Sequence, residues 1–291
     1  MKAEPSVITV GTFDGVHLGH RAVVGKVVED ARRRGARPLV ITFDPHPLAV
    51  VAPERMPGLL ESAAARCRRI ESMGAVPVLL EFNEELRRKT AAEWMEILRR
   101  DYGAVEVVAG YDNTFGCDGL KMSIHDYRSL GETLGVDVEE APIVEGISSS
   151  VIREALGRGD VERASEMLGY PYRIGGRVVH GKGLGHCLGY PTANVIPDGR
   201  LLLPANGVYA ADAELPSGEV RRAVVNVGKA PTVGSAFPVT VEAYITDFDG
   251  DLYDREIALD FLHRLRDERK FPSVEELTEQ ICADVEAARR L

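Results

Sequence analysis

Hydrophobic residues in the first half of the chain follow two alternating patterns. Short apolar runs occupy residues 7–10, 39–43, 78–82 and 105–109, and helical patterns lie between them at 20–34, 63–73 and 91–102. Strands that alternate with helices in this way form a parallel sheet covered on both faces. Ligands bind such sheets beyond the carboxyl ends of the strands. The pattern therefore predicts an α/β domain whose site lies in the loops that follow the strands.

The second half of the chain changes to a period of two after about residue 168. Turn residues such as Asp249 and Gly250 separate the alternating segments, which occupy residues 177–180, 208–214, 224–227, 239–245 and 257–262. Many short antiparallel strands predict a closed barrel or a sandwich. Ser273 and Glu276 have capping-box spacing and start a terminal helix. We place the domain boundary after a helix that starts at Asp160, which gives domains of residues 1–168 and 169–291.

The composition of the chain indicates which kinds of molecule it can bind. The 291 residues suffice for two domains, and the net charge of −10 argues against nonspecific nucleic-acid binding. The four cysteines have neither CxxC nor metal-ligand spacing, which indicates free thiols in a reducing compartment. We find no signal-peptide pattern and no run long enough to span a membrane. We therefore expect a cytoplasmic monomer or weak homo-oligomer that binds small molecules, with no nucleic-acid or membrane partner.

A glycine-rich loop, Gly11-Thr-Phe-Asp-Gly-Val-His-Leu-Gly-His20, joins the first strand to the first helix. Glycines let backbone amides approach a phosphate, and a helix N-terminus favours negative charge. Because Gly19 is small, the imidazoles of His17 and His20 can face one anion. Such donors suit nucleotidyl transfer, in which charge builds up on the phosphoryl oxygens. The alternative is a pair of histidines that only cap the helix.

A run of three serines precedes another predicted helix. Ser148, Ser149 and Ser150 can cap the helix that carries Arg153. Hydroxyls, amides and a guanidinium would then converge on triphosphate oxygens. An ordinary serine cap with a surface arginine is the alternative.

The strongest motif of the second half is His180-Gly-Lys-Gly-Leu-Gly-His-Cys-Leu-Gly-Tyr-Pro-Thr-Ala-Asn194. Its four glycines make a loop whose amides can wrap phosphates. Thr192 and Asn194 lie on one side of an extended segment, and their neutral oxygens suit Mg²⁺ together with substrate phosphates. The alternative is a glycine-rich hairpin followed by a turn. A Walker A motif is absent, which excludes a P-loop kinase.

The first of these motifs resembles the signature of the HxGH nucleotidylyltransferases. Its Phe-Asp-Gly-Val-His version is similar to the adenylyltransferase module of bacterial bifunctional riboflavin kinase/FAD synthetases, and segments 42–47 and 147–153 are similar to two further elements of that module. The resemblance implies a Rossmann-like domain with His17 and His20 as catalytic residues. It implies ATP contacts for Gly11, Thr12, Phe13, Asp14, Gly19, Ser148, Ser149, Ser150 and Arg153, and flavin contacts for Asp44, Pro45, His46, Pro47, Asp112 and Phe115.

The second half resembles the riboflavin kinase module of the same family. Pro-Thr-Ala-Asn194 is similar to its Mg²⁺-ATP motif, and segments 206–209, 226–232, 241–244 and 265–271 follow in the family's order. The resemblance implies an antiparallel barrel with Glu242 as the base for the ribityl 5′-hydroxyl, although a strand carboxylate usually faces solvent. The other implied residues are Gly181, Lys182, Gly183, Gly185 and Pro191 for ATP, Arg266 and Glu268 for the flavin, and Thr192 and Asn194 for Mg²⁺.

A few residues depart from the family pattern. Asn113 replaces an aromatic residue, and Cys117 and Asp118 stand where basic residues are common. Asp118 either repels an anionic substrate or faces water. Ser150 replaces a threonine, and His186 stands where arginine is frequent.

The resemblance covers almost the whole chain and implies two reactions. ATP and Mg²⁺ serve the phosphorylation of riboflavin to FMN and the adenylylation of FMN to FAD. One alternative is a riboflavin kinase whose first domain is impaired. Another is a flavin-binding regulatory protein without turnover, against which Glu242 and Thr192 argue.

Overall fold

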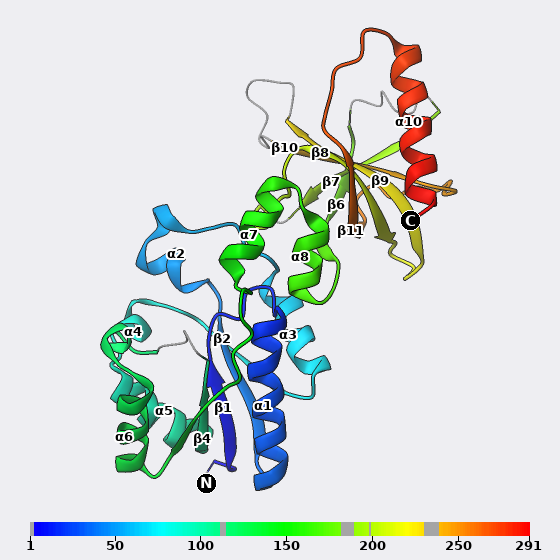
Figure 1. Cartoon of the computed structure of the whole chain (residues 1–291). Helices are drawn as coiled ribbons and strands as arrows, with labels where there is room; N and C mark the ends of the chain where they lie inside the picture. The colour runs from blue at the N-terminus through cyan, green and yellow to red at the C-terminus, as the bar shows by residue number, and fades with distance from the viewer. Residues whose placement is uncertain (1–2, 111–114, 182–188, 198, 230–238) are drawn as a thin grey trace. The chain divides into compact units, whose positions relative to one another are not determined.

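The structure is a computed structural model that describes residues 3–110, 115–181, 189–197, 199–229 and 239–291. The chain folds into two compact units, the first of Met1–Pro57 and Glu61–Ser149, the second of Gly58–Leu60 and Ser150–Leu291 (Figure 1). Helices α7 (Ser149–Arg158) and α8 (Val161–Leu168) pack almost entirely with the second unit. The two compact units therefore divide between Ser149 and Ser150, whereas the sequence predicts a domain boundary at residue 168.

A parallel sheet forms the centre of the first unit, with the strand order β3-β2-β1-β4-β5. Four of its strands are those that the apolar runs predict: β1 (Ser6–Val10), β2 (Arg37–Phe43), β3 (Val76–Leu80) and β4 (Ala104–Ala109). The fifth, β5 (Asp137–Glu140), buries only Val138 and has no apolar run that could predict it. The strand order reverses at β1, which lies between β2 and β4, and such a switch point is the usual ligand site of this architecture.

Helices cover both faces of this sheet, as the sequence predicts (Figure 1). Residues Val7 and Ile8 are adjacent on β1 and point to opposite faces, so each belongs to a different core cluster. One cluster packs under α1 (Leu18–Arg34) and α3 (Ala63–Ser72), and the other under α5 (Ala91–Tyr102) and α6 (Ile124–Leu134). Shorter helical turns are α2 (Pro47–Val51), η1 (Pro53–Arg55), α4 (Glu84–Arg87) and η2 (Gly119–Lys121).

The second unit contains a closed antiparallel barrel with the strand order β10-β7-β6-β11-β8-β9. The strands are β6 (Tyr172–Val179), β7 (Thr192–Pro197), β8 (Gly207–Glu214), β9 (Val220–Lys229), β10 (Val239–Ile245) and β11 (Glu256–Arg266). Of the two architectures that the period of two allows, the chain forms the barrel. Strand β7 occupies the Pro-Thr-Ala-Asn motif, for which a turn is the alternative.

The terminal helix α10 (Val274–Arg289) packs on the outside of the barrel. Val285 and Ala288 contribute its buried face, which lies against residues of β8 and β9. The Ser273 hydroxyl accepts a hydrogen bond from Glu276 N at 3.2 Å, which confirms the predicted helix start. Among the described residues, no helix has the length and apolar character needed to cross a bilayer.

Candidate active sites

The loop between β1 and α1 has a strained backbone. Phe13 and Val16 have positive φ angles of 49° and 29°, although neither is a glycine. Both side chains are buried in the core cluster under α1. A residue in such a conformation costs about 1–3 kcal/mol, and strained residues of this kind cluster at ligand sites. The strain is therefore an observation, independent of the sequence motif, that makes the glycine-rich loop a candidate functional segment.

His17 and His20 lie face to face within this loop. Their ring centroids are 3.7 Å apart and the ring planes differ by 16°. His17 is the N-cap of α1, and its Nδ1 accepts a hydrogen bond from His20 N at 3.3 Å. The proton of a neutral His17 ring is then on Nε2, which is the tautomer that can donate to a phosphoryl oxygen. A Cβ at position 19 would lie 3.2 Å from two atoms of the His17 ring, so this stacking favours glycine there.

His20 is uncharged at neutral pH. Burial lowers the pKa of His20 well below 6.5, and the nearby His17 and Arg66 lower it further. A neutral imidazole can donate one hydrogen bond and accept another without the desolvation cost of a buried charge. His17 therefore caps the helix and also has a chemically suitable tautomer, so the two interpretations of the histidine pair are compatible.

Arg66 of α3 joins the glycine-rich loop to the end of β2, a role that the motifs do not reveal. Its Nη1 donates to Thr12 O at 2.9 Å and its Nη2 donates to Phe43 O at 2.7 Å. The Thr42 hydroxyl donates to the same Thr12 carbonyl at 2.9 Å. The guanidinium is 2% exposed, and it joins the glycine-rich loop to the end of β2. The sequence offers one indication that Arg66 is buried. It lies four residues before the buried Ile70, on the apolar face of the same helix.

Asp14 and Glu61 form a buried acidic pair beside this loop. The Asp14 carboxylate accepts from Glu61 N at 3.3 Å, and its backbone carbonyl accepts from the Ser149 hydroxyl at 2.9 Å. Burial raises the pKa of Glu61 to about 7, against the opposing effect of Arg69, whose Nε lies 3.3 Å from Glu61 Oε2. Ser149 therefore contacts the glycine-rich loop, and its ATP contact stays a prediction. Arg153 lies in the second unit, where its Nε donates to Gly58 O at 2.9 Å.

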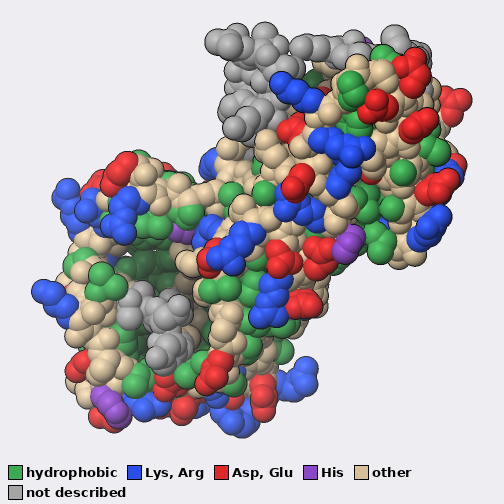
Figure 2. Space-filling view, turned by 45° about the horizontal axis from the view of Figure 1, so that its top comes forward, with side chains coloured by type: hydrophobic (Ala, Val, Ile, Leu, Met, Phe, Trp, Pro, Cys, Tyr) green, Lys and Arg blue, Asp and Glu red, His purple; other side chains and the backbone are tan. Residues whose placement is uncertain are grey.

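A cavity of about 500 Å³ opens at the carboxyl ends of β1 and β2, and Figure 2 shows a hollow in the first unit with hydrophobic side chains at its floor. Gly11 and Thr12 of the glycine-rich loop line the cavity, as do the predicted residues Pro47 and Phe115. Most of the rest of the wall is apolar, and it includes the aromatic residues Phe43, Phe82 and Trp94. An apolar cavity of this size suits a flat ring system with a polar tail. Phe82 and Trp94 are not part of any motif, so the sequence does not identify them.

The segment Asp44–Pro47 follows β2 at the side of this cavity. His46 is the N-cap of α2, and its Nδ1 accepts from Leu48 N at 3.1 Å. Asp44 N donates to Leu80 O at 3.0 Å, which ties the segment to the end of β3. Pro47 lines the cavity. The segment therefore contributes a wall of the cavity through Pro47 and a helix cap through His46.

Asp118 has a structural role that differs from both expectations for it. Its Oδ1 accepts a hydrogen bond from Ala91 N at 2.8 Å, at the start of α5. The carboxylate therefore satisfies a helix N-terminus, where negative charge is favourable. Gly116 has a φ of +93°, and a Cβ there would lie 2.3 Å from Ala91 N. Gly116 thus permits the close approach that Asp118 needs.

In the barrel, three polar residues form a row across neighbouring strands. Glu242 of β10 pairs with Asn194 of β7 on one side and with Asn226 of β9 on the other. Directly opposite residues have Cβ atoms about 5 Å apart, so these side chains share one face. The adjacent Val241 and Ala243 are buried, which places Glu242 on the opposite, outer face of the barrel wall. We call Asn194, Glu242 and Asn226 the carboxamide row.

Two glycines approach the carboxamide row closely. A Cβ at Gly181 would lie 2.1 Å from Asn194 Nδ2, so the backbone of this predicted ATP residue rests on the Asn194 amide. A Cβ at Gly228 would lie 2.4 Å from Glu268 Oε1 and 3.3 Å from Asn226 Nδ2. The predicted flavin residue Glu268 is thereby placed beside the carboxamide row. The structure thus brings together residues from four separate motifs of the second half.

A second cavity, of about 300 Å³, lies at the barrel beside the Pro-Thr-Ala-Asn motif. Pro191 and Thr192 line it together with the aromatic residues Phe248 and Tyr253. The His180 ring stacks on Tyr253 with a centroid distance of 3.7 Å and an interplanar angle of 26°. An aromatic wall next to the predicted phosphate and metal residues suits a purine ring.

The predicted flavin residue Arg266 forms an ion pair with Asp284 of α10, with Nη2 2.8 Å from Oδ2. The predicted residues Asp112, Lys182, Gly183 and Gly185 lie outside the described residues, as do Asn113 and His186.

Comparison with known proteins identifies both halves separately. The model of the FAD synthetase family matches residues 1–154, and the model of the riboflavin kinase family matches residues 168–291. A bifunctional riboflavin kinase/FMN adenylyltransferase from Pseudomonas fluorescens is 39% identical over 98% of this chain and 92% of its own length. A protein of the same description from Bacillus subtilis (strain 168) is 36% identical with the same coverage.

A crystal structure extends the likeness to three dimensions. It is described as a macrolide-efflux protein from Streptococcus pneumoniae, is 32% identical, and covers 99% of this chain and 95% of its own with a TM-score of 0.89. Its description differs from that of the two relatives, and the likeness here supports the fold.

Proposed function

This chain belongs to the family of bifunctional riboflavin kinase/FMN adenylyltransferases, and we propose that each of its two units carries one of the two reactions. It phosphorylates riboflavin to FMN and adenylylates FMN to FAD, with ATP as the donor in both reactions. A kinase with an impaired first domain and a regulatory protein without turnover are the weaker alternatives, because both family models match. For the domains we retain the division at residue 168, where the riboflavin kinase match begins.

We assign adenylyl transfer to the first unit because the loop that carries the stacked histidines also lines the aromatic cavity through Gly11 and Thr12. In this reaction a phosphate oxygen of FMN attacks the α-phosphorus of ATP, and pyrophosphate leaves. The flavin ring would occupy the cavity, with Phe43, Phe82 and Trp94 around it. His17 and His20 would donate to the phosphoryl oxygens, whose charge grows in the transition state.

We assign phosphoryl transfer to the carboxamide row of the barrel. The terminal ribityl hydroxyl of riboflavin attacks the γ-phosphorus of ATP, ADP leaves, and Glu242 accepts the hydroxyl proton. Its neighbours Asn194 and Asn226 are neutral, so they can orient the carboxylate by hydrogen bonds while leaving its charge intact. The adenine ring would lie in the cavity beside Pro191 and Thr192.

Mg²⁺ is the cation that we propose for the kinase site. Thr192 and Asn194 offer a hydroxyl and an amide oxygen on one side of β7, and the described residues contain no cluster of three or more His, Cys, Asp or Glu side chains that could form a separate cage. This donor set fits Mg²⁺, which typically takes a few protein oxygens and completes its shell with phosphates and water. When bound, the ion would neutralise phosphate charge. The cytoplasmic location and the monomeric or weakly oligomeric state remain predictions.

Chromatography of the products from riboflavin, ATP and Mg²⁺ tests the function directly. We expect FMN to form first and FAD to follow, and FMN supplied with ATP should yield FAD and pyrophosphate. Formation of FMN without FAD would favour a kinase alone, and the absence of both products would favour a flavin-binding regulator.

A further inference from the structure

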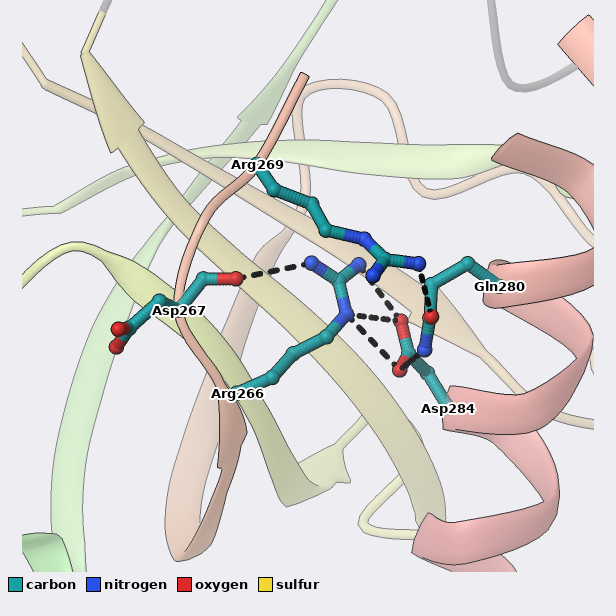
Figure 3. Close-up of polar contacts among 5 residues, drawn as sticks. All are labelled: Arg266, Asp267, Arg269, Gln280 and Asp284. Carbon is teal, nitrogen blue, oxygen red and sulfur yellow. Dashed lines mark hydrogen bonds and ion pairs between the residues drawn. The ribbon is translucent and has the colours of Figure 1, made fainter. Parts of the chain in front are cut away.

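The end of β11 and the terminal helix α10 are joined by a largely buried ion pair (Figure 3). Arg266 Nε donates to both carboxylate oxygens of Asp284 at 3.0 Å, and Nη2 donates to Asp284 Oδ2 at 2.8 Å. The side chains of Arg266 and Asp284 are 20% and 6% exposed. Desolvation of two charges offsets much of their attraction, so such a pair contributes little net stability. The pair instead fixes the orientation of the Arg266 guanidinium, because several hydrogen bonds hold its plane.

The contacts continue from Asp284 to the segment that follows β11 (Figure 3). Gln280 donates its Nε2 to Asp284 Oδ1 at 2.7 Å, and its Oε1 accepts from Arg269 Nη2. Arg266 Nη1 donates to Asp267 O at 3.0 Å. Helix α10 therefore holds residues 266–269 at both ends of the segment.

This segment carries Glu268, which lies beside the carboxamide row at Gly228. The Glu268 carboxylate lies against Gly228 and next to the Asn226 amide. Asn226 is paired across the sheet with Glu242. A series of neighbouring residues thus leads from Asp284 on the terminal helix to the proposed base on β10.

We infer that Asp284 is a positioning residue of the riboflavin kinase site, which acts by fixing Arg266 and the segment that carries Glu268. The inference rests on the proposed riboflavin kinase activity and on the flavin contacts that the family resemblance implies for Arg266 and Glu268. Without the Asp284 charge, Arg266 loses the partner that sets its orientation, and residues 266–269 gain freedom. Riboflavin binding should weaken, whereas ATP binding, which we assign to the cavity beside Pro191 and Thr192, should not.

A second arginine–aspartate pair in the same barrel offers a matched control. Asp260 accepts from Arg173 Nε at 2.7 Å and from Arg173 Nη2 at 2.6 Å, so it too binds a guanidinium through both oxygens. Its side chain is 19% exposed. Asp260 lies on the same strand as Arg266 but about 20 Å away along it. Loss of this pair should perturb the barrel without disturbing residues 266–269.

The experiment measures steady-state riboflavin phosphorylation by the full chain and by three variants, with KM determined separately for riboflavin and ATP. We expect Asp284→Asn to raise the KM for riboflavin about tenfold, the effect of losing one charged hydrogen bond, with the KM for ATP unchanged. Asp284→Glu keeps the charge and should restore part of the affinity. Asp260→Asn should leave both KM values at the wild-type level.

Each outcome decides the inference. An unchanged riboflavin KM in Asp284→Asn would overturn it, as would an equal rise in Asp260→Asn, which would reveal a general effect on the barrel. Should Asp284→Asn fail to fold, as judged by thermal unfolding, Gln280→Ala provides the milder version, with a smaller rise in the same KM expected and an unchanged KM overturning the inference. A wild-type chain that makes no FMN would instead overturn the proposed function, which distinguishes the two failures.

Discussion

The Arg66 guanidinium donates to the carbonyl of Thr12 at 2.9 Å from a position almost closed to solvent. Thr12 belongs to the loop of the histidine pair, so a residue some 50 positions later in the sequence sets the backbone of that loop. The same guanidinium reaches Phe43 O, next to the segment that borders the aromatic cavity. One buried cation therefore couples the proposed phosphate side of the site to its flavin side.

Replacement of Arg66 should separate the two activities. Arg66→Met removes a donor from the Thr12 and Phe43 carbonyls, and we expect FAD formation to fall about 100-fold, as a small misplacement of reacting groups can cause. Arg66→Lys keeps the charge but lacks the planar fork, so its activity should lie between those of Arg66→Met and the wild type. FMN formation measured in the same preparations should not change. Arg68→Met, an exposed arginine of the same helix, is the control; a similar loss of FAD formation there would contradict a role specific to Arg66.

The histidine pair should be required for FAD formation alone. His20→Ala and His17→Ala remove a donor from the transition state, which should lower FAD formation about 100-fold to 1000-fold while FMN formation persists. His17→Asn keeps a side-chain acceptor for the helix cap and should retain stability without recovering activity. Product chromatography with riboflavin and with FMN as substrates checks both reactions. Equal loss of both activities in a folded variant would contradict the two-site arrangement.

Glu242→Gln should reduce FMN formation and leave FAD formation from FMN intact. The amide keeps the shape of the side chain but cannot accept the hydroxyl proton, so riboflavin phosphorylation should fall about 10²-fold to 10⁴-fold. FMN adenylylation by the same variant should remain at the wild-type rate. The exposed Glu256 of β11 provides the matched control, since Glu256→Gln removes an equal charge from the barrel surface. Wild-type phosphorylation by Glu242→Gln would show that another group accepts the proton.

Glu61 should make stability depend on pH. Burial raises the pKa of its carboxyl from 4.5 to about 7, so the folded chain retains a proton that the unfolded chain releases between these values. The free energy of unfolding therefore falls as the pH rises from 4.5 to about 7, and the loss is complete above that range. Glu61→Gln removes this loss, and its Tm should exceed that of the wild type at pH 8 but not at pH 4. Melting curves at both pH values test this; an equal difference at the two would argue against the raised pKa.

Asp118 should matter for stability and not for substrate affinity. Asp118→Arg removes the acceptor from Ala91 N and places a positive charge at the start of α5, so we expect a loss of about 1–2 kcal/mol in the free energy of unfolding. Asp118→Asn keeps an acceptor and should lose less. Denaturant titrations measure the stability of both variants. A lower KM for FMN or ATP in Asp118→Arg would instead support the repulsive interpretation of this carboxylate.

The strongly periodic elements of the fold are predictable from the sequence, whereas elements held mainly by their surroundings are not. The helix at Ala91–Tyr102 shows its apolar face and its capping box directly in the sequence. Strand β5 exposes most of its residues, and β7 begins within a motif whose glycine and proline residues indicate a loop as readily as a strand. Packing and backbone pairing with neighbouring strands determine that β5 and β7 are strands, and these interactions produce no recognisable hydrophobic pattern in the local sequence.

Some residues of the candidate sites can likewise be identified from sequence motifs, and others cannot. The motif residues Gly11, Thr12 and Thr192 line cavities, because each motif follows or begins a strand. Arg66 and Glu61 could not be identified, since a buried charge is recognised only by the partners that the fold brings to it. The aromatic wall has the same origin: Phe82 and Trp94 come from different elements that only the sheet order brings together.

The short segment Gly58–Leu60 has a consequence for dividing this chain into working halves. Leu59 N donates to Arg200 O at 2.7 Å, and Leu202 N donates to Leu59 O at 2.8 Å, so three residues from the first part of the sequence complete the second unit. A fragment that begins at Ser150 or later lacks this segment and leaves both backbone groups of the 200–202 stretch without their partners, at a cost of about 1 kcal/mol for each hydrogen bond. A kinase half released by a single cut is therefore expected to be less stable than the same unit in the full chain. Fusing residues 58–60 to such a fragment should restore both hydrogen-bond partners and the lost stability.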